Sequence, residues 1–290
     1  MITRGHEIIV GYDGSAGSAE ALDWAMREAR LRHLRLTLCH TWSAGYAAAG
    51  AEARPKGRSR ARADAVDPEC EHAREVLAMG TRRVQAYEPA MTPEQLLACG
   101  PAARVLCEQC SGSDMLVVGS RGIGGLPGLL LGSVSLQVAA HARVPVTVVR
   151  GRWRPAAGQY PLPVVVGIDG SVGSRAALDF AVEEATLRDV PLVAVCALSD
   201  AAGVFGTGRS IEADFMTALG KVEADHPDLL AEKRVEQGAP RSALLAAASH
   251  GQLLVVGARG RRGLPEMRLG SVSLAVLHHA PCPVTVVHGT

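Results

Sequence analysis

The stretch EIIVGYDGSAGSAEALDWAMREA, residues 7–29, recurs as PVVVGIDGSVGSRAALDFAVEEA at residues 163–185. Each copy starts with an apolar run that ends in glycine, which is typical of a strand covered on both faces. Apolar residues at helical spacing follow, and in the first copy Ser18 is the expected N-cap of a helix over residues 18–32. The chain is therefore predicted to be an internal duplication built from strand-then-helix units.

Two further matches place the rest of the repeat. DMLVVGSRG at 114–122 matches QLLVVGARG at 252–260, and VPVTVV at 144–149 matches CPVTVV at 282–287. The offset between the copies falls from 156 residues at the first match to 138 at the later ones, so the first half carries about 18 extra residues. The segment 43–67, rich in Ala, Gly, Arg and Ser, is the expected place, and we expect a mobile surface loop there.

The alternation of strands and helices predicts an α/β fold with two tandem doubly wound, Rossmann-like domains, each with a five-stranded, mostly parallel sheet. The domains are expected at 1–150 and 163–290, joined by a Pro- and Gly-rich linker at 151–162. Helices are also expected near 68–80 and 101–111. The expected strands lie near 7–12, 35–42, 82–88, 115–120 and 145–150, and in the second half near 163–168, 191–197, 229–235, 252–257 and 283–288.

The composition is that of a soluble globular protein, with 48% hydrophobic residues, 20% charged residues and a formal net charge of +1. This charge balance argues against a nucleic-acid binder, and no apolar run is long enough to span a membrane. Residues 1–10 lack the features of a signal peptide. Seven scattered cysteines suit a reducing cytoplasm, and the Cys107–Cys110 pair lacks a second pair for zinc.

Two segments of each half are expected to meet at the carboxyl ends of the strands, where open α/β sheets bind ligands. One is the Asp-Gly-Ser triplet at 13–15 and again at 169–171. The other is GSRGIGGLPGLLLGSVS at 119–135, repeated as GARGRRGLPEMRLGSVS at 257–273. Its glycines permit positive φ and the close approach of a ligand, and the helix that starts at its Gly-Ser offers N–H groups to phosphate.

The side chains of these segments suggest two ends of a nucleotide. Arg121 and Arg259 can form forked hydrogen bonds with phosphate oxygens. A carboxylate beside a triphosphate would repel it, so Asp13 and Asp169 are assigned to ribose hydroxyls or an adenine amine. The alternatives are Asx turns for the aspartates, plain N-caps for the serines and solvated side chains for the arginines. The expected hydroxyl donors are Ser133, Ser135, Ser271 and Ser273.

The two copies differ between their glycines. The span IGGLPGLLL at 123–131 is apolar, whereas RRGLPEMRL at 261–269 brings in Glu266 and three arginines. A carboxylate near phosphates is unfavourable unless it points away or pairs with an arginine. We therefore expect two nucleotide sites of unequal affinity.

The pattern Gly-x2-Gly-x9-Gly-Ser, together with Asp-Gly-Ser after the first strand, resembles the universal stress proteins and their ATP-binding branch in particular. The resemblance covers nearly the whole chain twice, and so implies a tandem-domain member. It implies ATP as the ligand, with accompanying Mg²⁺ and any metal ligands left open. It also implies that the strands VPVTVV and CPVTVV pair between domains, so that the chain forms its own pseudo-dimer and a homodimer is optional. The residues implied for ATP binding are Asp13, Thr41, Val118, Gly119, Arg121, Gly122, Gly132, Ser133, Val134 and Ser135, and then Asp169, Ala197, Val256, Gly257, Arg259, Gly260, Gly270, Ser271, Val272 and Ser273.

Three functions fit these observations. The first is a nucleotide-dependent regulator of stress response with slow or no ATP turnover. The second is an ATPase, kinase or nucleotidyl-transferase, which would require a positioned base that the sequence does not provide as a Lys–carboxylate or Cys–His pair. The third is an electron-transfer flavoprotein-like module with the same broad topology. Four histidines without carboxylate partners at ligand spacing are interpreted as structural: His40, His141, His278 and His279.

Overall fold

The computed structural model describes residues 6–42, 68–124, 130–150, 161–198, 207–261 and 268–289. The expected loop at 43–67 and most of the expected linker at 151–162 lie outside these residues. The middle parts of the two glycine-rich loops, 125–129 and 262–267, also lie outside them.

Each half alternates strands and helices along the chain. The first half contains β1 (Glu7–Gly11), α1 (Ala16–Arg32), β2 (Arg35–Trp42), α2 (Pro68–Tyr87), β3 (Glu94–Cys99), α3 (Ala102–Gln109), β4 (Met115–Gly119), α4 (Ser133–His141) and β5 (Val146–Val149). The second contains β6 (Val164–Gly167), α5 (Val172–Arg188), β7 (Leu192–Leu198), α7 (Thr207–Asp225), β8 (Ala231–Gln237), α8 (Pro240–Ala248), β9 (Leu253–Gly257), α9 (Ser271–His279) and β10 (Val284–Val287).

The strands of both halves form one continuous sheet in the order β3-β2-β1-β4-β5-β10-β9-β6-β7-β8. Within each half the pairings are parallel. The two halves are joined by the antiparallel pairing of β5 with β10. The predicted fold class is thus confirmed, and so is the predicted pairing of the two terminal strands within the chain.

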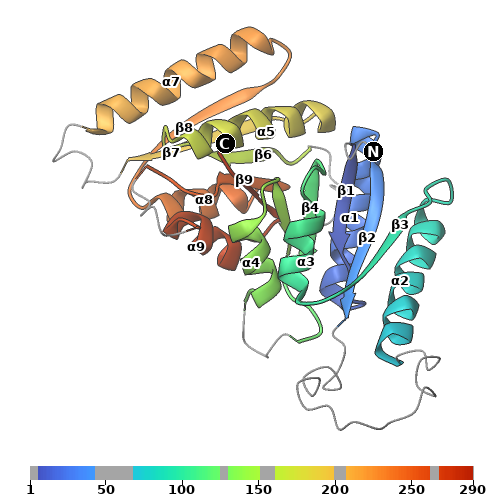
Figure 1. The fold of residues 1–290 in the computed structure, drawn as a ribbon. Coiled ribbons are helices and arrows are strands. Elements are labelled where there is room, and N and C mark those ends of the chain that lie inside the picture. Colours follow the sequence, from blue (N-terminus) through green and yellow to red (C-terminus); the bar gives the residue numbers. More distant parts are fainter. Residues whose placement is uncertain are drawn as a thin grey trace, which may run out of the picture.

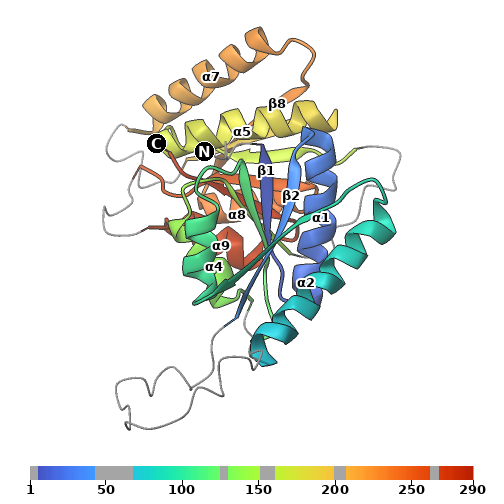
Figure 2. The ribbon, with the colours of Figure 1, turned by 45° about the vertical axis from the view of Figure 1, so that its right-hand side comes forward.

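The helices cover both faces of this sheet (Figures 1 and 2). α1, α2, α5 and α7 pack on one face, and α3, α4, α8 and α9 pack on the other. Two apolar layers result, because alternate residues of a strand point to opposite faces: Ile8 and Val10 lie in one layer and Ile9 in the other. This double burial explains the continuous apolar runs of the central strands.

The strand expected near 82–88 is wrong. Residues 82–87 are the end of α2, and the third strand is β3, which begins at Glu94. The buried residues of α2 recur at helical spacing and include Val84, which is fully buried in the core. The Arg83 guanidinium also pairs with Asp23 of α1 at 2.6 Å. This segment is therefore a helix packed beside α1, and the strand that pairs with β2 is β3.

The expected N-cap at Ser18 is also wrong by one turn. Ser15 caps α1, because its Oγ accepts a hydrogen bond of 3.2 Å from the Ser18 N–H. In the second half Ser171 caps α5 in the same way, accepting from the Ser174 N–H at 3.1 Å. The serine of each Asp-Gly-Ser triplet therefore starts the helix that follows the first strand.

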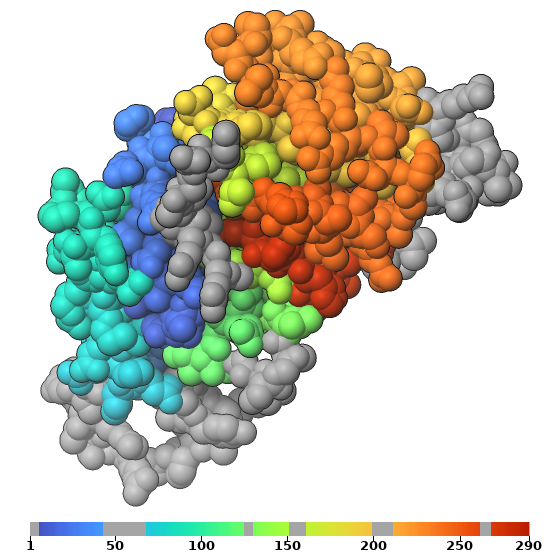
Figure 3. Space-filling view, turned by 180° about the vertical axis from the view of Figure 1, so that it is seen from behind, coloured from blue at the N-terminus to red at the C-terminus, as the bar shows by residue number. Residues whose placement is uncertain are grey.

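The join between the halves lies at β5 and β10. Thr147 and Thr285 stand directly opposite each other in the pairing, and their Oγ1 atoms are 2.8 Å apart with both side chains fully buried. These threonines are equivalent residues of the repeat, so a pseudo-twofold axis passes between them. Figure 3 shows the first half, blue to green, and the second half, yellow to red, packed against each other along this join.

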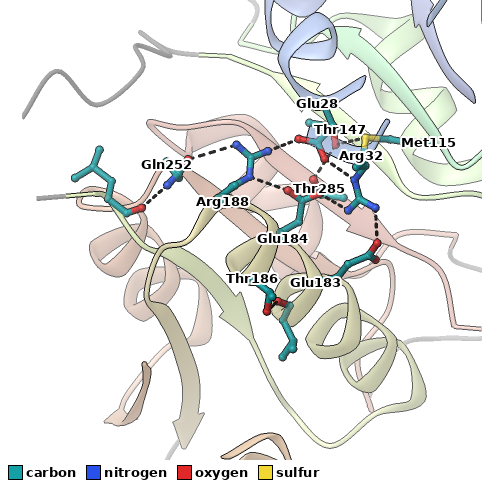
Figure 4. Close-up of polar contacts among 12 residues, drawn as sticks. Glu28, Arg32, Met115, Thr147, Glu183, Glu184, Thr186, Arg188, Gln252 and Thr285 are labelled. Atoms are coloured by element: carbon teal, nitrogen blue, oxygen red, sulfur yellow. Dashed lines mark hydrogen bonds and ion pairs between the residues drawn. The ribbon is translucent and has the colours of Figure 1, made fainter. Parts of the chain in front are cut away.

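A cluster of buried charges sits between α1 and α5 beside the two threonines (Figure 4). Arg32 contacts Glu28 at 2.5 Å in its own helix and Glu184 of the other half at 2.6 Å. Arg188 makes the equivalent contacts, with Glu184 at 2.8 Å and with Glu28 across the join. The four side chains are 0–10% exposed, so water contributes little to their solvation.

Aromatic rings flank this cluster in the same symmetric way. The Arg32 guanidinium lies 5.3 Å from the centre of the Phe180 ring, and that of Arg188 lies 5.5 Å from the centre of the Trp24 ring. Trp24 and Phe180 are equivalent residues, each contacting an arginine of the opposite half. Both are core residues, since they are 1% and 9% exposed.

We predict that Arg188→Met lowers the free energy of unfolding by about 3–5 kcal/mol, because it leaves Glu28 and Glu184 buried without one of their two cations. The measurement is urea unfolding of the full chain. Arg104→Met is the matched control, because Arg104 forms an exposed pair with Glu108 at 2.7 Å with the same spacing on a helix. It is expected to change stability little. Equal losses for the two variants would contradict a special role of the buried cluster.

Candidate functional site at the carboxyl ends of the strands

Asp13 links the ends of two neighbouring strands. Its Oδ1 accepts a hydrogen bond of 3.0 Å from the Ser15 N–H, and its Oδ2 accepts one of 2.9 Å from the Ile123 N–H in the loop after β4. Burial by itself would raise the pKa of Asp13, but the hydrogen bonds from Ser15, Ile123 and Ser18 outweigh it and lower the pKa. The Asx turn considered from the sequence is therefore present, and the same carboxylate also holds the β4 loop.

The second half reproduces this arrangement atom for atom. Asp169 Oδ1 accepts from the Ser171 N–H at 3.0 Å, and Oδ2 accepts from the Arg261 N–H at 3.0 Å. Arg261 is the repeat equivalent of Ile123, so the backbone contact is kept while the side chain changes. The structure thus brings the segments after the first and fourth strands together in both copies.

Close packing requires a glycine in the loop after β4 and another in the loop after β9. A Cβ on Gly122 would lie 2.3 Å from Asp13 Oδ2, and one on Gly260 would lie 2.4 Å from Asp169 Oδ2. The expectation of positive φ in these loops is wrong for both residues. Positive φ is found instead at Gly14 and Gly170, at 80° and 78°, inside the Asp-Gly-Ser triplets.

The start of α4 completes the first site. Gly132 is its N-cap and carries no side-chain cap, and the Gly132 N–H donates to the Ser120 carbonyl at 2.7 Å. The first-turn N–H groups of α4 are therefore directed outward beside the β4 loop, at the positive end of the helix dipole. Ser133 is exposed there, whereas Ser135 is buried and its Oγ donates to the Gly119 carbonyl at 2.6 Å. Ser135 thus fixes the helix against β4.

The start of α9 has the same geometry. The Gly270 N–H donates to the Ala258 carbonyl at 2.8 Å, and the helix again has no side-chain cap. Ser271 is exposed, and the buried Ser273 donates to the Gly257 carbonyl at 2.7 Å. The first turn of each of these helices therefore has one exposed serine and one buried serine that hydrogen-bonds within the protein.

The remaining predicted residues surround these two centres. Thr41 and Ala197 lie half-buried near the carboxyl ends of β2 and β7. Arg121 and Arg259 are exposed in the loops that follow β4 and β9. The side chains of Val118 and Val256 are buried in the core, whereas those of Val134 and Val272 are half-buried at the first helical turns.

The surroundings of the two triplets differ. The space beside Gly14 is lined by Val76 and Met79 of α2, whose methyl carbons would lie 3.6 and 3.5 Å from an added Cβ. Beside Gly170 the corresponding atoms are Arg261 Nη1 at 3.5 Å and Asp214 Oδ2 of α7 at 3.6 Å. One site is therefore apolar and the other charged at the end that carries the aspartate.

The structure also shows residues that the sequence alone did not single out. The helix caps Ser15 and Ser171, and the backbone donors at Ile123 and Arg261, form most of the hydrogen bonds around the two aspartates. The fixed spacing of Asp-Gly-Ser in both copies was the available signal for the caps. The backbone donors carried no signal, because isoleucine and arginine occupy equivalent positions.

A doubled Rossmann-like unit with a glycine loop and an uncapped helix start after its fourth strand places the chain among the doubly wound α/β proteins. The model of the universal stress protein family matches residues 6–150 and 162–288. A universal stress protein of Mycolicibacterium smegmatis is 36% identical over 97% of this chain and 96% of its own length. The chain belongs to the universal stress protein family, with a copy of the family domain in each half.

A solved structure gives the same assignment of fold. The crystal structure of a universal stress protein from Archaeoglobus fulgidus superposes with a TM-score of 0.73 at 20% identity and covers 100% of both chains. A universal stress protein solved in complex with cAMP matches 44% of this chain and 98% of its own, at 30% identity and a TM-score of 0.36. Among the residues that the structure describes, no helix is long and apolar enough to cross a membrane.

We predict that Ile123→Pro raises the pKa of Asp13, because proline removes the N–H that stabilises its carboxylate. A carboxyl group with a lowered pKa adds stability above its unfolded pKa, and that stability is lost as the pH falls through the folded pKa. The variant should therefore lose less stability on acidification. NMR titration of the Asp13 carboxyl carbon is the measurement. Ile123→Val keeps the N–H and serves as the control, and an unchanged pKa in the proline variant would contradict the assigned hydrogen bond.

Proposed function

We propose that this protein binds ATP in each half and acts as a nucleotide-dependent regulator of stress response. The base and ribose would lie beside Asp13 or Asp169, and the phosphates would lie between the glycine loop and the start of α4 or α9. The two sites would differ in affinity, because their surroundings differ at Gly14 and Gly170. We place this activity in the cytoplasm, which suits the seven cysteines, all of them free thiols.

The observation that carries the proposal is the duplicated backbone geometry. In both halves an aspartate accepts from the loop after the fourth strand, and an uncapped helix N-terminus is fixed beside that loop by a serine. Helix N-termini of this kind favour phosphate groups, because their free N–H groups and the helix dipole act together. The side chains around this frame differ between halves, whereas the frame itself does not.

The state of Asp13 supports binding rather than rapid turnover. A general base works best with a pKa near the working pH, whereas the hydrogen bonds on Asp13 lower its pKa. Its carboxylate is thus a stable acceptor for sugar hydroxyls and a weak acceptor of protons in a reaction. We propose slow or no ATP turnover on this ground, and we leave an accompanying Mg²⁺ as part of the proposal to be tested.

We predict that Gly132→Ala weakens nucleotide binding to the first site, and Gly270→Ala to the second, by about tenfold or more. The added methyl group would occupy the side from which phosphate approaches. Within the protein it would meet its nearest atom only at 3.4 Å for Gly132 and 3.6 Å for Gly270, so the fold should tolerate both changes. Calorimetry with ATP should give two unequal sites for the natural chain and one for each variant.

Gly220→Ala is the matched control, because an added Cβ there has no described neighbour within 4 Å and the residue lies on α7. Its binding curve should match that of the natural chain. Nucleotide released from freshly purified protein should be identified by mass analysis in parallel. If no adenine nucleotide binds, or if neither glycine variant changes binding, the proposed sites are wrong.

We predict that multiple turnover of ATP is slow or undetectable in the natural chain, because the hydrogen bonds on Asp13 lower its pKa and make it a weak general base. The measurement is phosphate release over many equivalents of ATP, with and without Mg²⁺. Asp13→Ala is the comparison variant. Fast turnover that disappears in Asp13→Ala would identify the protein as an enzyme and overturn the regulatory assignment.

A further inference from the structure

The last strand of each half ends in a residue that reaches across to the other half. The Arg150 guanidinium, directly after β5, donates from Nη1 to the Leu277 carbonyl of α9. His288, directly after β10, has its Nε2 atom 3.0 Å from the Ala139 carbonyl of α4. Because a carbonyl only accepts, Nε2 carries the hydrogen, and a second proton would add at Nδ1. Both contacts occupy equivalent positions of the repeat, 138 residues apart.

These two residues lie next to the proposed phosphate sites. The Val149 carbonyl, one residue before Arg150, accepts from the Ser120 N–H at 2.8 Å. The Val287 carbonyl, one residue before His288, accepts from the Ala258 N–H at 2.7 Å. Ser120 and Ala258 are the residues whose own carbonyls accept from the helix N-caps Gly132 and Gly270. Arg150 and His288 are therefore one backbone hydrogen bond away from the cradle of their own half.

The charges near Arg150 are positive. Burial lowers its pKa, the nearby Cys282 opposes this, and the Arg121 charge has a smaller effect that lowers the pKa further. Its Nε is buried without a hydrogen-bond partner among the described residues. Arg150 in turn lowers the pKa of His278 of α9, although burial and the adjacent His279 have larger effects there. Basic side chains from both halves thus lie near Arg150.

The second site has a histidine where the first has an arginine. Burial is the main cause that lowers the pKa of His288, and the hydrogen bond to Ala139 opposes it. The charged groups that face it, Arg259, His141 and Arg268, lower its pKa further. Arg259 and Arg268 come from the loop between β9 and α9 and His141 from α4, and all three are basic. The neutral imidazole is therefore favoured near pH 7 in the absence of an anion.

We infer that Arg150 and His288 set the charge of the two phosphate sites, so that the first site binds nucleotide phosphates with a permanent cation and the second with a cation that forms on acidification. The inference rests on the proposed nucleotide sites and adds a regulation to them. A polyphosphate beside His288 favours the imidazolium, and by linkage the protonated form binds the polyphosphate more tightly. Affinity at the second site should therefore rise as the pH falls, relative to the first site.

The test uses the full chain and ATP at constant ionic strength, from about pH 8 to about pH 6, across the titration range of histidine. Gly132→Ala isolates the second site and Gly270→Ala the first. The second site should gain about three- to tenfold more affinity than the first, which corresponds to a ligand-induced pKa rise of about half to one unit. The first site is the internal control, because ATP changes its own protonation equally for both.

Exchanging the two residues sharpens the test. In the chain that keeps only the second site, His288→Arg should give tight binding at the higher pH and remove the extra pH dependence. In the chain that keeps only the first site, Arg150→His should introduce that dependence. His141→Gln should leave the dependence of the second site in place, because His141 faces His288 without replacing its charge.

The outcomes separate the inference from the proposed function. If ATP binds to both sites but their affinities change in parallel with pH, or if His141→Gln removes the dependence that His288→Arg retains, the roles of Arg150 and His288 are wrong while the nucleotide sites stand. If no ATP binds at any pH, the proposed sites fail and this inference fails with them. Thermal unfolding without nucleotide identifies any variant that does not fold. If one of His288→Arg and Arg150→His fails to fold, the pH dependence of the other tests the inference.

Discussion

The antiparallel pairing of β5 with β10 is the constraint on which the rest of the molecule depends. It buries the apolar edge that each five-stranded half would otherwise expose, with Thr147 and Thr285 hydrogen-bonded on the pseudo-twofold axis. It also brings α1 against α5, so that these two helices must match each other across the axis. Because the two strands run in opposite directions, the carboxyl ends of the two halves face opposite ends of the sheet, and the two candidate sites are kept apart.

The buried charges between α1 and α5 follow from this pairing. Taking four charged groups out of water costs more than their attraction returns unless the geometry is good, so such a cluster is poor evidence for extra stability. Each arginine here contacts one glutamate of its own helix and the buried glutamate of the other half, and Arg32 also contacts the exposed Glu183 at 2.7 Å. Burial and the Glu184 charge raise the pKa of Glu28 to about 7, while the two arginines outweigh burial and lower the pKa of Glu184. These ion pairs can all form in only one alignment of α1 with α5. We infer that they select that alignment.

Most of the architecture could be predicted because the sequence contains two copies of the same unit. The failure at β3 shows the limit of a prediction made within one copy, since nearly all of the expected strand at 82–88 belongs to α2, which ends at Tyr87. The second copy indicates the correct position of this strand. β8 at Ala231–Gln237, shifted back by 138 residues, falls on residues 93–99, where β3 is found. The Ser18 error has a different cause. Two serines stand three residues apart, and which of them caps the helix depends on where the strand ends.

The candidate site was predicted in its parts but not in its internal contacts. Glycine at 122 was expected to serve a turn or a ligand, whereas the structure requires it because Asp13 Oδ2 occupies the space of a side chain. Ser135 was expected to donate outward and instead holds Gly119. Both facts depend on atoms that are distant in the sequence, so no local pattern could reveal them.

Comparison of the two halves separates the frame of the site from its adjustable parts. The hydrogen bonds of the aspartates, the uncapped helix starts and the buried serines recur in both copies with distances that agree within about 0.1 Å. The side chains that face this frame do not recur: Val76 becomes Asp214, Ile123 becomes Arg261 and Arg150 becomes His288. A duplicated chain can keep two copies of a backbone device and change the charge around one of them. We therefore propose that the two candidate sites differ through these side chains and not through the backbone that they share.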